Sequence, residues 1–233
     1  MLKILLIDIG NSRTKACEWD AQTMKPVFSC DTSVLGKALA ELDLTLYSRC
    51  VVASVVPDSN DSFKGLSIPV QLIDHESVSG ITIEMDKPEE VGADRLVSAA
   101  GAYSEYKQSV LVVDAGTAVT FCYVAANGVY KGGAILPGMA IASKALNDYT
   151  AKIPLVWVAE QKSLLGKTTK EAVEIGLYHG YIAMINGMIA QYREMDPGVV
   201  VIGSGNGIEV LGDRLNLDET DQLLPFKGLA LTS

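Results

Sequence analysis

The chain has 233 residues, of which 48% are hydrophobic and 20% are charged, and its formal net charge is -9 at pH 7. These values are ordinary for a folded protein, and the length allows one large domain or two small ones. The negative charge gives no support to a nucleic-acid or anionic-membrane partner, and the longest apolar stretches are far too short to span a membrane. Because the N-terminus opens on a strand pattern rather than a signal segment, we expect a cytoplasmic protein.

Strand and helix patterns alternate along the first half of the chain. Segments with buried or alternating apolar patterns are predicted strands: 2–8, 14–19, 26–30, 50–56 and 70–73. Segments with helical spacing are predicted helices: 35–42 and 93–106. Polar clusters predict a turn at 20–25 and a loop at 86–90.

The same plan restarts near residue 108. Predicted strands cover 110–113, 118–124, 129–131 and 199–202, and predicted helices cover 139–148, 169–195 and 208–215. The stretch "AANG" at 125–128 predicts a hairpin turn between two of these strands. We therefore predict two tandem domains, residues 1–108 and residues 109–233, with a similar strand arrangement at the start of each.

The cysteines and histidines do not predict a metal site. Cys17, Cys30, Cys50 and Cys122 form no C-x-x-C pair, and the two histidines lie far from them in the sequence. Each cysteine lies beside apolar residues in a strand pattern, so we predict four buried thiols.

A short motif occurs once in each half, directly after a buried strand. The first copy is Asp8-Ile9-Gly10 and the second is Asp114-Ala115-Gly116. The glycine lets the backbone approach a ligand, backbone N–H groups in such loops hold phosphate oxygens, and the aspartate supplies a carboxylate for a cation. A single D-x-G is more often an ordinary turn. Two copies in matching contexts favour nucleotide binding and phosphoryl transfer instead.

Five motifs occur in a fixed order: "DIGNSRTK" at 8–15, "VGADR" at 91–95, "VDAGTAVTF" at 113–121, "GGAILPG" at 132–138 and "TAKIP" at 150–154. In this order and spacing the chain resembles the type III pantothenate kinases, in the acetate kinase/sugar kinase/heat-shock protein 70/actin superfamily. The resemblance implies an α/β fold of two tandem ribonuclease H-like (actin-like ATPase) domains, with mixed sheets flanked by helices. It also implies ATP-dependent phosphorylation of pantothenate to 4'-phosphopantothenate, the first step of coenzyme A synthesis.

The resemblance assigns nucleotide and metal contacts to both turns. In the first half the ATP-binding residues would be Asp8, Gly10, Asn11, Ser12, Arg13, Thr14 and Lys15. Among them Asp8 would organise Mg²⁺ and Lys15 would neutralise charge on the phosphoryl group. In the second half Asp114 would bind a monovalent cation, K⁺ or NH₄⁺, and Thr117 would contact ATP.

The resemblance also assigns a substrate loop, Gly92 to Arg95, and a threonine at 169. Asp94 would accept the hydroxyl proton of pantothenate, Arg95 would meet its carboxylate, and Gly92 and Ala93 would shape the loop. Thr169 would contact pantothenate. The alternatives are structural: a helix N-cap with an exposed ion pair at 94–95, and a helix N-cap at Thr169.

The chain departs from the family pattern at two places. Met85 stands where the family often has a tyrosine, and Gly203-Ser204-Gly205 stands where a Thr-Gly-Gly turn is usual. The resemblance further implies a homodimer, to which the apolar stretch 178–189 would contribute; the alternative for that stretch is a fully buried core helix. The alternatives for function are a kinase of another small hydroxy acid and a non-catalytic, actin-like ATP-binding regulator.

Overall fold

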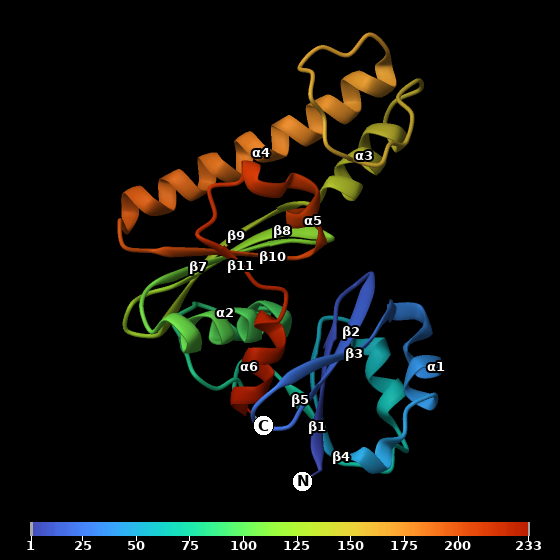
Figure 1. Ribbon diagram of the computed structural model, residues 1–233, viewed down its shortest axis with the longest axis vertical. Helices are drawn as coiled ribbons and strands as arrows, with labels where there is room; N and C mark the ends of the chain where they lie inside the picture. Colours follow the sequence, from blue (N-terminus) through green and yellow to red (C-terminus); the bar gives the residue numbers. More distant parts are fainter. Residues whose placement is uncertain (1, 233) are drawn as a thin grey trace. The chain divides into compact units, whose positions relative to one another are not determined.

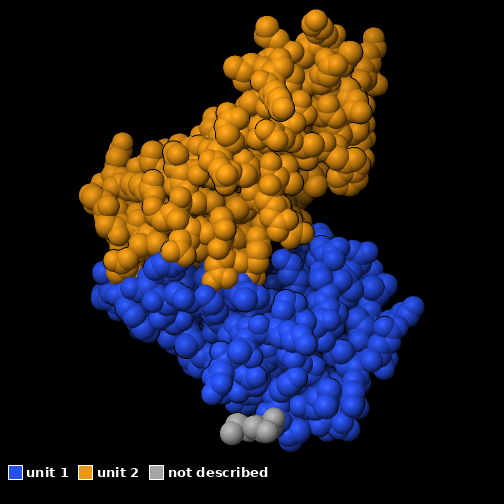
Figure 2. Space-filling view, viewed as in Figure 1, with its two compact units in different colours: residues 1–107, 124–132, 223–233 blue, residues 108–123, 133–222 orange. Residues whose placement is uncertain are grey.

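The computed structural model describes residues 2–232. Contacts group the chain into two compact units, shown in different colours in Figure 2. The first unit contains residues 1–107, 124–132 and 223–233, and the second contains residues 108–123 and 133–222. These units are defined by contacts in space and combine separate stretches of the chain. The predicted domains, divided at residue 108, are defined by the sequence repeat and stay a prediction. No helix among residues 2–232 is long and apolar enough to cross a membrane.

The first unit is built on a five-stranded mixed sheet with the order β3-β2-β1-β4-β5 (Figure 1). The strands are β1 (Lys3–Ile9), β2 (Arg13–Trp19), β3 (Met24–Asp31), β4 (Tyr47–Ser54) and β5 (Val70–Ile73). β2 pairs antiparallel with both β1 and β3, whereas β4 pairs in parallel with β1 and β5 pairs in parallel with β4. All five strands were predicted, with ends that differ by up to three residues.

Both faces of the central strand β1 are covered, which explains its unbroken apolar run. Leu5 and Ile7 face one core together with Leu35 of helix α1 (Leu35–Ala40). Leu6 faces the other core together with Val97 of helix α2 (Ala93–Tyr106). Because successive strand residues point to opposite faces, one strand supplies both cores.

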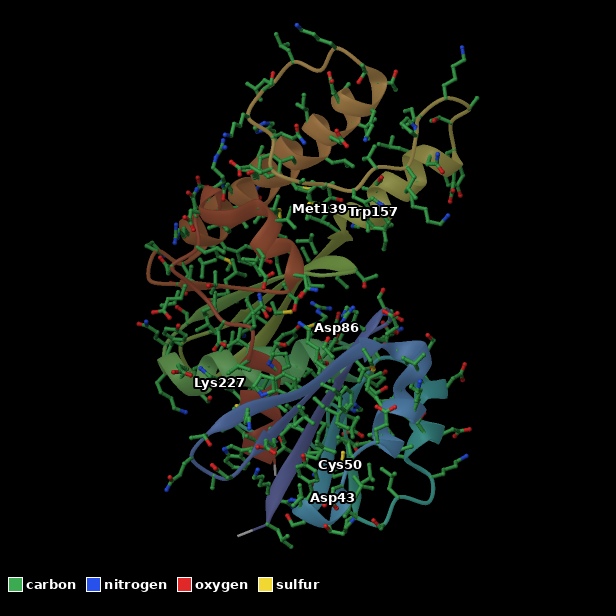
Figure 3. The ribbon with its side chains drawn as sticks, turned by 45° about the vertical axis from the view of Figure 1, so that its right-hand side comes forward. Asp43, Cys50, Asp86, Met139, Trp157 and Lys227 are labelled. Atoms are coloured by element: carbon green, nitrogen blue, oxygen red, sulfur yellow. The ribbon has the colours of Figure 1, made fainter. Side chains whose placement is uncertain are left out.

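The last helix of the chain, α6 (Leu224–Thr232), belongs to the first unit and packs against α2. The two helices approach so closely at Gly101 and Gly228 that a Cβ atom on either glycine would overlap a backbone carbonyl oxygen of the facing helix. At the edge of this helix pair, Lys227 of α6 (Figure 3) forms an ion pair with Glu105 of α2. Helix α6 was not predicted from the sequence.

The second unit repeats the strand order of the first. Its strands are β7 (Val110–Ala115), β8 (Ala118–Val124), β9 (Val129–Pro137), β10 (Val200–Ser204) and the short β11 (Glu219–Thr220). The order β9-β8-β7-β10-β11 matches β3-β2-β1-β4-β5 strand for strand, and β10 pairs in parallel with β7 and β11. Residues 124–132, which include the predicted hairpin turn, group with the first unit, where the short β6 (Thr82–Ile83) pairs with the start of β9. The predicted α/β fold with two mixed sheets is confirmed.

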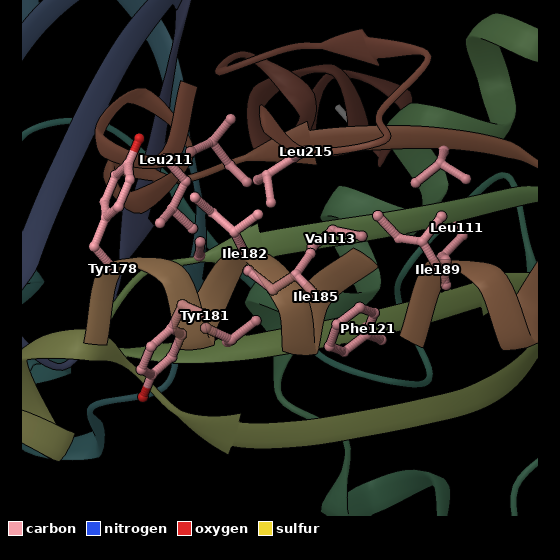
Figure 4. Close-up of a cluster of buried hydrophobic side chains, with 14 of the residues drawn as sticks. Leu111, Val113, Phe121, Tyr178, Tyr181, Ile182, Ile185, Ile189, Leu211 and Leu215 are labelled. Carbon is pink, nitrogen blue, oxygen red and sulfur yellow. The ribbon is translucent and has the colours of Figure 1, made fainter. Parts of the chain in front are cut away.

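Helices α3 (Met139–Asp148), α4 (Thr169–Met195) and α5 (Asn206–Leu211) belong to the second unit. Figure 4 shows one face of α4 packed on the sheet. The core residues from α4 include Tyr178, Tyr181, Ile182, Ile185 and Ile189. They meet Leu111, Val113 and Phe121 of the strands and, further along the chain, Leu211 and Leu215. Short 3-10 turns complete the structure at 32–34, 44–46, 57–63, 88–90 and 212–214.

The four cysteines are free thiols, three of them buried. Burial raises the pKa of Cys50 on β4 (Figure 3) to about 12 and that of Cys17 to about 11. The prediction of buried thiols is therefore confirmed for Cys17, Cys50 and Cys122, whereas Cys30 is only half-buried because it lies on β3, at the edge of the sheet.

Candidate active site

The first Asp-x-Gly motif forms a tight turn between β1 and β2. The turn closes through a hydrogen bond from the Gly10 N–H to the Arg13 carbonyl oxygen, 3.0 Å between N and O. It is held from outside by Thr32, whose hydroxyl donates to the Gly10 carbonyl oxygen at 2.7 Å and whose N–H donates to the Ser12 carbonyl oxygen at 3.1 Å. The Thr32 hydroxyl also lies 3.1 Å from the buried Thr14 hydroxyl. Thr32 was not predicted, and it fixes the shape of the turn.

The side chains predicted to bind ATP differ in their exposure. Asn11, Ser12 and Arg13 are exposed, whereas Asp8, Gly10 and Lys15 are half-buried and Thr14 is fully buried. Asp8 and Lys15 are directly opposite each other in the antiparallel pair of β1 and β2, so a carboxylate and an ammonium group neighbour the turn. The Arg13 guanidinium reaches β3, where it donates to the Ser29 hydroxyl at 2.8 Å.

Asp94 lies in the first turn of α2, at the same end of the sheet as the first Asp-x-Gly turn. The Val55 N–H, just after β4, donates to the Ile9 carbonyl oxygen at 3.1 Å, and a Cβ atom on Gly92 would lie 3.2 Å from the Val55 side chain. The first unit therefore brings together two predicted segments, 8–15 and 92–95, that are far apart in the sequence.

The carboxylate of Asp94 is half-buried and accepts a hydrogen bond from the Arg95 N–H at 2.7 Å. A Cβ atom on Gly92 would lie 2.7 Å from this carboxylate oxygen, so the glycine leaves room for it. Burial raises the pKa of Asp94, and the N–H and the charge of Arg95 oppose that rise. Gly92 is the N-cap of α2, which makes the predicted alternative of an Asp94 N-cap wrong.

The second Asp-x-Gly motif forms the turn between β7 and β8. The turn closes through a hydrogen bond from the Gly116 N–H to the Ala118 carbonyl oxygen at 2.9 Å, and Thr117 is exposed at its tip. Half-buried Asp114 lies beside glycines: a Cβ atom on Gly116 would lie 3.3 Å from its Oδ1 atom, and one on Gly205 would lie 2.6 Å from the same atom.

The residues at both turns include carboxylates that fit cations. Mg²⁺ is usually bound through one or two carboxylates together with substrate phosphates, and Asp8 offers a carboxylate whose Oδ1 atom is shielded from solvent. At the second turn the carboxylate of Asp114 lies beside Gly116 and Gly205, and the carbonyl oxygen of Ala115 also lies close to Gly205. Carboxylate and carbonyl oxygen atoms are the donors that a large, weakly hydrated cation would accept.

Thr169 is the first residue of α4 and is exposed. The N-cap of this helix is Thr168, whose hydroxyl accepts a hydrogen bond from the Glu171 N–H at 3.2 Å. The predicted alternative of an N-cap at Thr169 is therefore wrong by one residue, and the Thr169 hydroxyl is not used for capping.

Met85 and a surface cavity are two further features of the first unit. Met85 is exposed and its sulfur would lie 3.0 Å from a Cβ atom on Gly132, so the side chain covers that glycine. A cavity of about 660 Å³ lies among Trp19, Ser104 and Lys227 and contains none of the predicted site residues.

Two mixed sheets of equal strand order, each with an Asp-x-Gly turn after its first strand, define a fold of the actin-like ATPase and sugar kinase class. The same fold is found in a Sinorhizobium meliloti protein named as a 2-dehydro-3-deoxygalactonokinase, with a TM-score of 0.62 and 11% identity over 98% of this chain and 97% of that one. A family model described as type III pantothenate kinase matches residues 4–191. The chain belongs to this family.

Named relatives agree with the family model. The chain is 30% identical to the type III pantothenate kinase of Listeria monocytogenes, over 98% of this chain and 95% of that protein. It is 36% identical to that of Phenylobacterium zucineum, over 82% of this chain and 77% of that protein. The protein is therefore a kinase, and its family implies ATP and a divalent metal ion.

Proposed function

We propose that the protein transfers the γ-phosphoryl group of ATP to the primary hydroxyl of pantothenate, the first step of coenzyme A synthesis. One observation carries the proposal: within the first unit, the half-buried carboxylate of Asp94 lies at the same end of the sheet as the turn at 8–15. A primary alcohol is too weakly acidic to ionise by itself, so a neighbouring carboxylate has to take its proton during transfer.

In the proposed reaction the substrate oxygen forms a bond to the γ-phosphorus, and the bond from that phosphorus to the β–γ bridging oxygen breaks. The proton of the hydroxyl moves to Asp94, and ADP leaves. Arg95 meets the substrate carboxylate, and Thr169 contributes a contact to pantothenate. The raised pKa of Asp94 suits this role, because a carboxylate with a raised pKa is a stronger base.

The first turn holds the phosphates in this proposal. Backbone N–H groups of Asn11 and Ser12 and the hydroxyl of Ser12 face the phosphate oxygens, and Lys15 offsets their negative charge. Arg13, Thr14 and Gly10 complete the turn. A divalent cation bound at Asp8 supplies further charge neutralisation to the phosphates when present.

The second turn has a different task in this proposal. Asp114 binds a monovalent cation, K⁺ or NH₄⁺, and Thr117 contacts ATP. The support is the surroundings of Asp114: its carboxylate lies beside Gly116 and Gly205, and oxygen atoms are the ligands that such a cation prefers.

We further propose that the protein is a homodimer. The face of α4 opposite the core presents small, exposed residues at helical spacing: Gly176, Gly180, Ala183, Gly187 and Ala190. Large apolar side chains of the segment between α3 and α4 are also exposed, including Tyr149 at 90% and Trp157 (Figure 3) at 77%. Exposed apolar surface is a common mark of protein interfaces. Light scattering that gave a monomer mass at assay concentration with full activity would rule the dimer out.

The alternatives are a kinase of another small hydroxy acid and a non-catalytic ATP-binding regulator. An ATP-coupled assay across pantothenate and related hydroxy acids, with the product mass determined, distinguishes all three. We expect a product heavier than pantothenate by one phosphoryl group, and slower turnover of the other acids. A faster rate with a different acid would reassign the substrate, and no turnover by folded protein would favour the regulator. We also propose that the protein is cytoplasmic, because it would act in coenzyme A synthesis.

A further inference from the structure

The side chain of Gln222 bonds both backbone groups of one residue, Gly205, which directly follows β10. Its Oε1 atom accepts a hydrogen bond from the Gly205 N–H at 3.1 Å, and its Nε2 atom donates to the Gly205 carbonyl oxygen at 3.2 Å. Gln222 is half-buried and is the last residue of the second unit before the chain continues into α6. A primary amide matches both backbone groups because it carries a donor and an acceptor side by side.

The backbone conformation and the close packing of Gly205 both require a glycine at this position. Its φ is +85° and its ψ is 155°, a backbone conformation that is essentially restricted to glycine. A Cβ atom there would lie 2.6 Å from Oδ1 of Asp114 and 2.8 Å from the carbonyl oxygen of Ala115. The backbone of Gly205 therefore packs directly against the carboxylate that we assign to the monovalent cation.

We propose that Gln222 is a positioning residue for the second turn, which holds Gly205 against Asp114 and so sets the affinity for the monovalent cation and for ATP. The proposal rests on the role proposed above for Asp114. Gln222 acts through Gly205 and touches neither ligand in this scheme. Without the amide, the Gly205 N–H loses its side-chain acceptor and the loop after β10 becomes free to move away from Asp114.

The second unit offers a matched control in Asn186 on α4. Its side-chain amide also bonds the backbone twice, donating to the Arg214 carbonyl oxygen at 2.9 Å and accepting from the Asn216 N–H at 2.8 Å. Gln222 and Asn186 are both half-buried, so Gln222→Ala and Asn186→Ala remove similar numbers of hydrogen bonds. Only Gln222 holds a residue that packs on Asp114.

The test measures Gln222→Ala, Gln222→Glu and Asn186→Ala by two readouts. The first readout is kinetic and gives two constants: the K⁺ concentration for half-maximal activity and the KM for ATP. The second readout measures binding without turnover. It comprises the affinity for ATP by titration calorimetry without pantothenate and the rise in Tm when K⁺ replaces Na⁺. Loss of two neutral hydrogen bonds predicts a weakening of about tenfold in the K⁺ and ATP constants of Gln222→Ala, with the KM for pantothenate unchanged. Gln222→Glu keeps the size of the side chain, loses the donor and adds a negative charge, and both changes should weaken ATP binding.

Asn186→Ala should lower Tm by a similar amount while leaving the K⁺ and ATP constants at their wild-type values. Equal shifts in Asn186→Ala, or unchanged constants in folded Gln222→Ala, would overturn the proposal; if the alanine variant does not fold, unchanged constants in Gln222→Glu would do so. The variant Asp114→Asn separates this failure from failure of the cation site. If Asp114→Asn alters the K⁺ response and the Gln222 variants do not, only the inference about Gln222 fails. If none of them alters it, the cation site fails as well.

Discussion

The two Asp-x-Gly turns share a backbone plan but differ in what surrounds them. Side-chain hydroxyls hold the first turn from outside, at Thr14 and Thr32, and a lysine pairs across the strands with Asp8. Glycines and backbone oxygen atoms enclose the second, and Gly205 reaches the carboxylate of Asp114. This difference agrees with our proposal that the two copies have specialised, the first to receive phosphate and the second to receive a cation.

The largest effect on activity is expected for Asp94, which lies in neither Asp-x-Gly turn. Asp94→Asn keeps the shape of the side chain but removes the base, and general-base catalysis contributes about 10²–10⁴-fold, so kcat should fall by about that factor. ATP affinity should change little because both turns are intact. The exposed Asp86 (Figure 3) provides the control, since Asp86→Asn removes a carboxylate from the loop before α2 and should leave kcat unchanged. Near-normal kcat in folded Asp94→Asn would mean that Asp94 is not the base.

Gly205→Ala should damage the second turn and spare the first. The new Cβ atom would lie 2.6 Å from Oδ1 of Asp114 and would also strain the backbone. Gly212 has a similarly restricted backbone, with φ +61°, but nothing within 4 Å of its Cβ position. Gly212→Ala therefore measures strain alone, of about 1–3 kcal/mol. We expect a larger fall in the free energy of unfolding for Gly205→Ala, together with a weakened K⁺ response; equal losses in the two variants would show that the contact with Asp114 has no consequence.

Thr32→Val should damage the first turn and spare the second. Valine keeps the volume but leaves the Gly10 carbonyl oxygen without the Thr32 hydroxyl, which should lower the free energy of unfolding by about 1–3 kcal/mol. Thr23→Val removes an exposed hydroxyl that bonds Asp20 at 2.9 Å in the β2–β3 hairpin, and it should cost about 0.5 kcal/mol or less. Denaturant unfolding of both variants measures the difference, and equal costs would contradict a supporting role of Thr32.

The smallest effect is expected in the pH dependence. Burial raises the pKa of Asp94 above 3.8, and the base acts only when deprotonated. The acid limb of kcat/KM should therefore be centred above the ordinary aspartate value. Between the unfolded and folded pKa values the native state binds more protons, so the contribution of Asp94 to the free energy of unfolding should decrease as pH rises through that window. An acid limb at or below 3.8 would show that the carboxylate is not desolvated in the working enzyme.

The sequence predicted elements with a clear period and missed those without one. Helices 93–106, 139–148 and 169–195 are confirmed because each follows one helical pattern over at least ten residues. The two-residue strands β6 and β11 are too short to show any pattern. Helix α6 was missed because it is apolar on several faces and contains Pro225 and Gly228, two residues that are unfavourable inside a helix. Gly228 is needed because α2 packs too closely for a larger residue, and the sequence of α6 alone does not show this.

The residues of the candidate site also fall into predicted and missed groups. The motif residues were predicted because a sequence resemblance marks them, whereas Thr32 and Gln222 have no local signal. Thr32 lies 22 residues from the turn that it holds, and Gln222 lies 17 residues from Gly205. Such contacts depend on which strands become neighbours in the folded sheet, and the sequence pattern of a single segment does not contain that information.

Exchange of cations tests the specialisation of the two turns most directly. Initial rates are measured in K⁺ and in Na⁺ at fixed ionic strength, and as a function of Mg²⁺, for the wild type, Asp8→Asn and Asp114→Asn. We predict that the wild type is far slower in Na⁺ than in K⁺, that Asp114→Asn loses this discrimination but keeps its Mg²⁺ dependence, and that Asp8→Asn shows the reverse. Equal wild-type rates in Na⁺ and K⁺, or loss of the K⁺ response in Asp8→Asn with its retention in Asp114→Asn, would contradict the assignment.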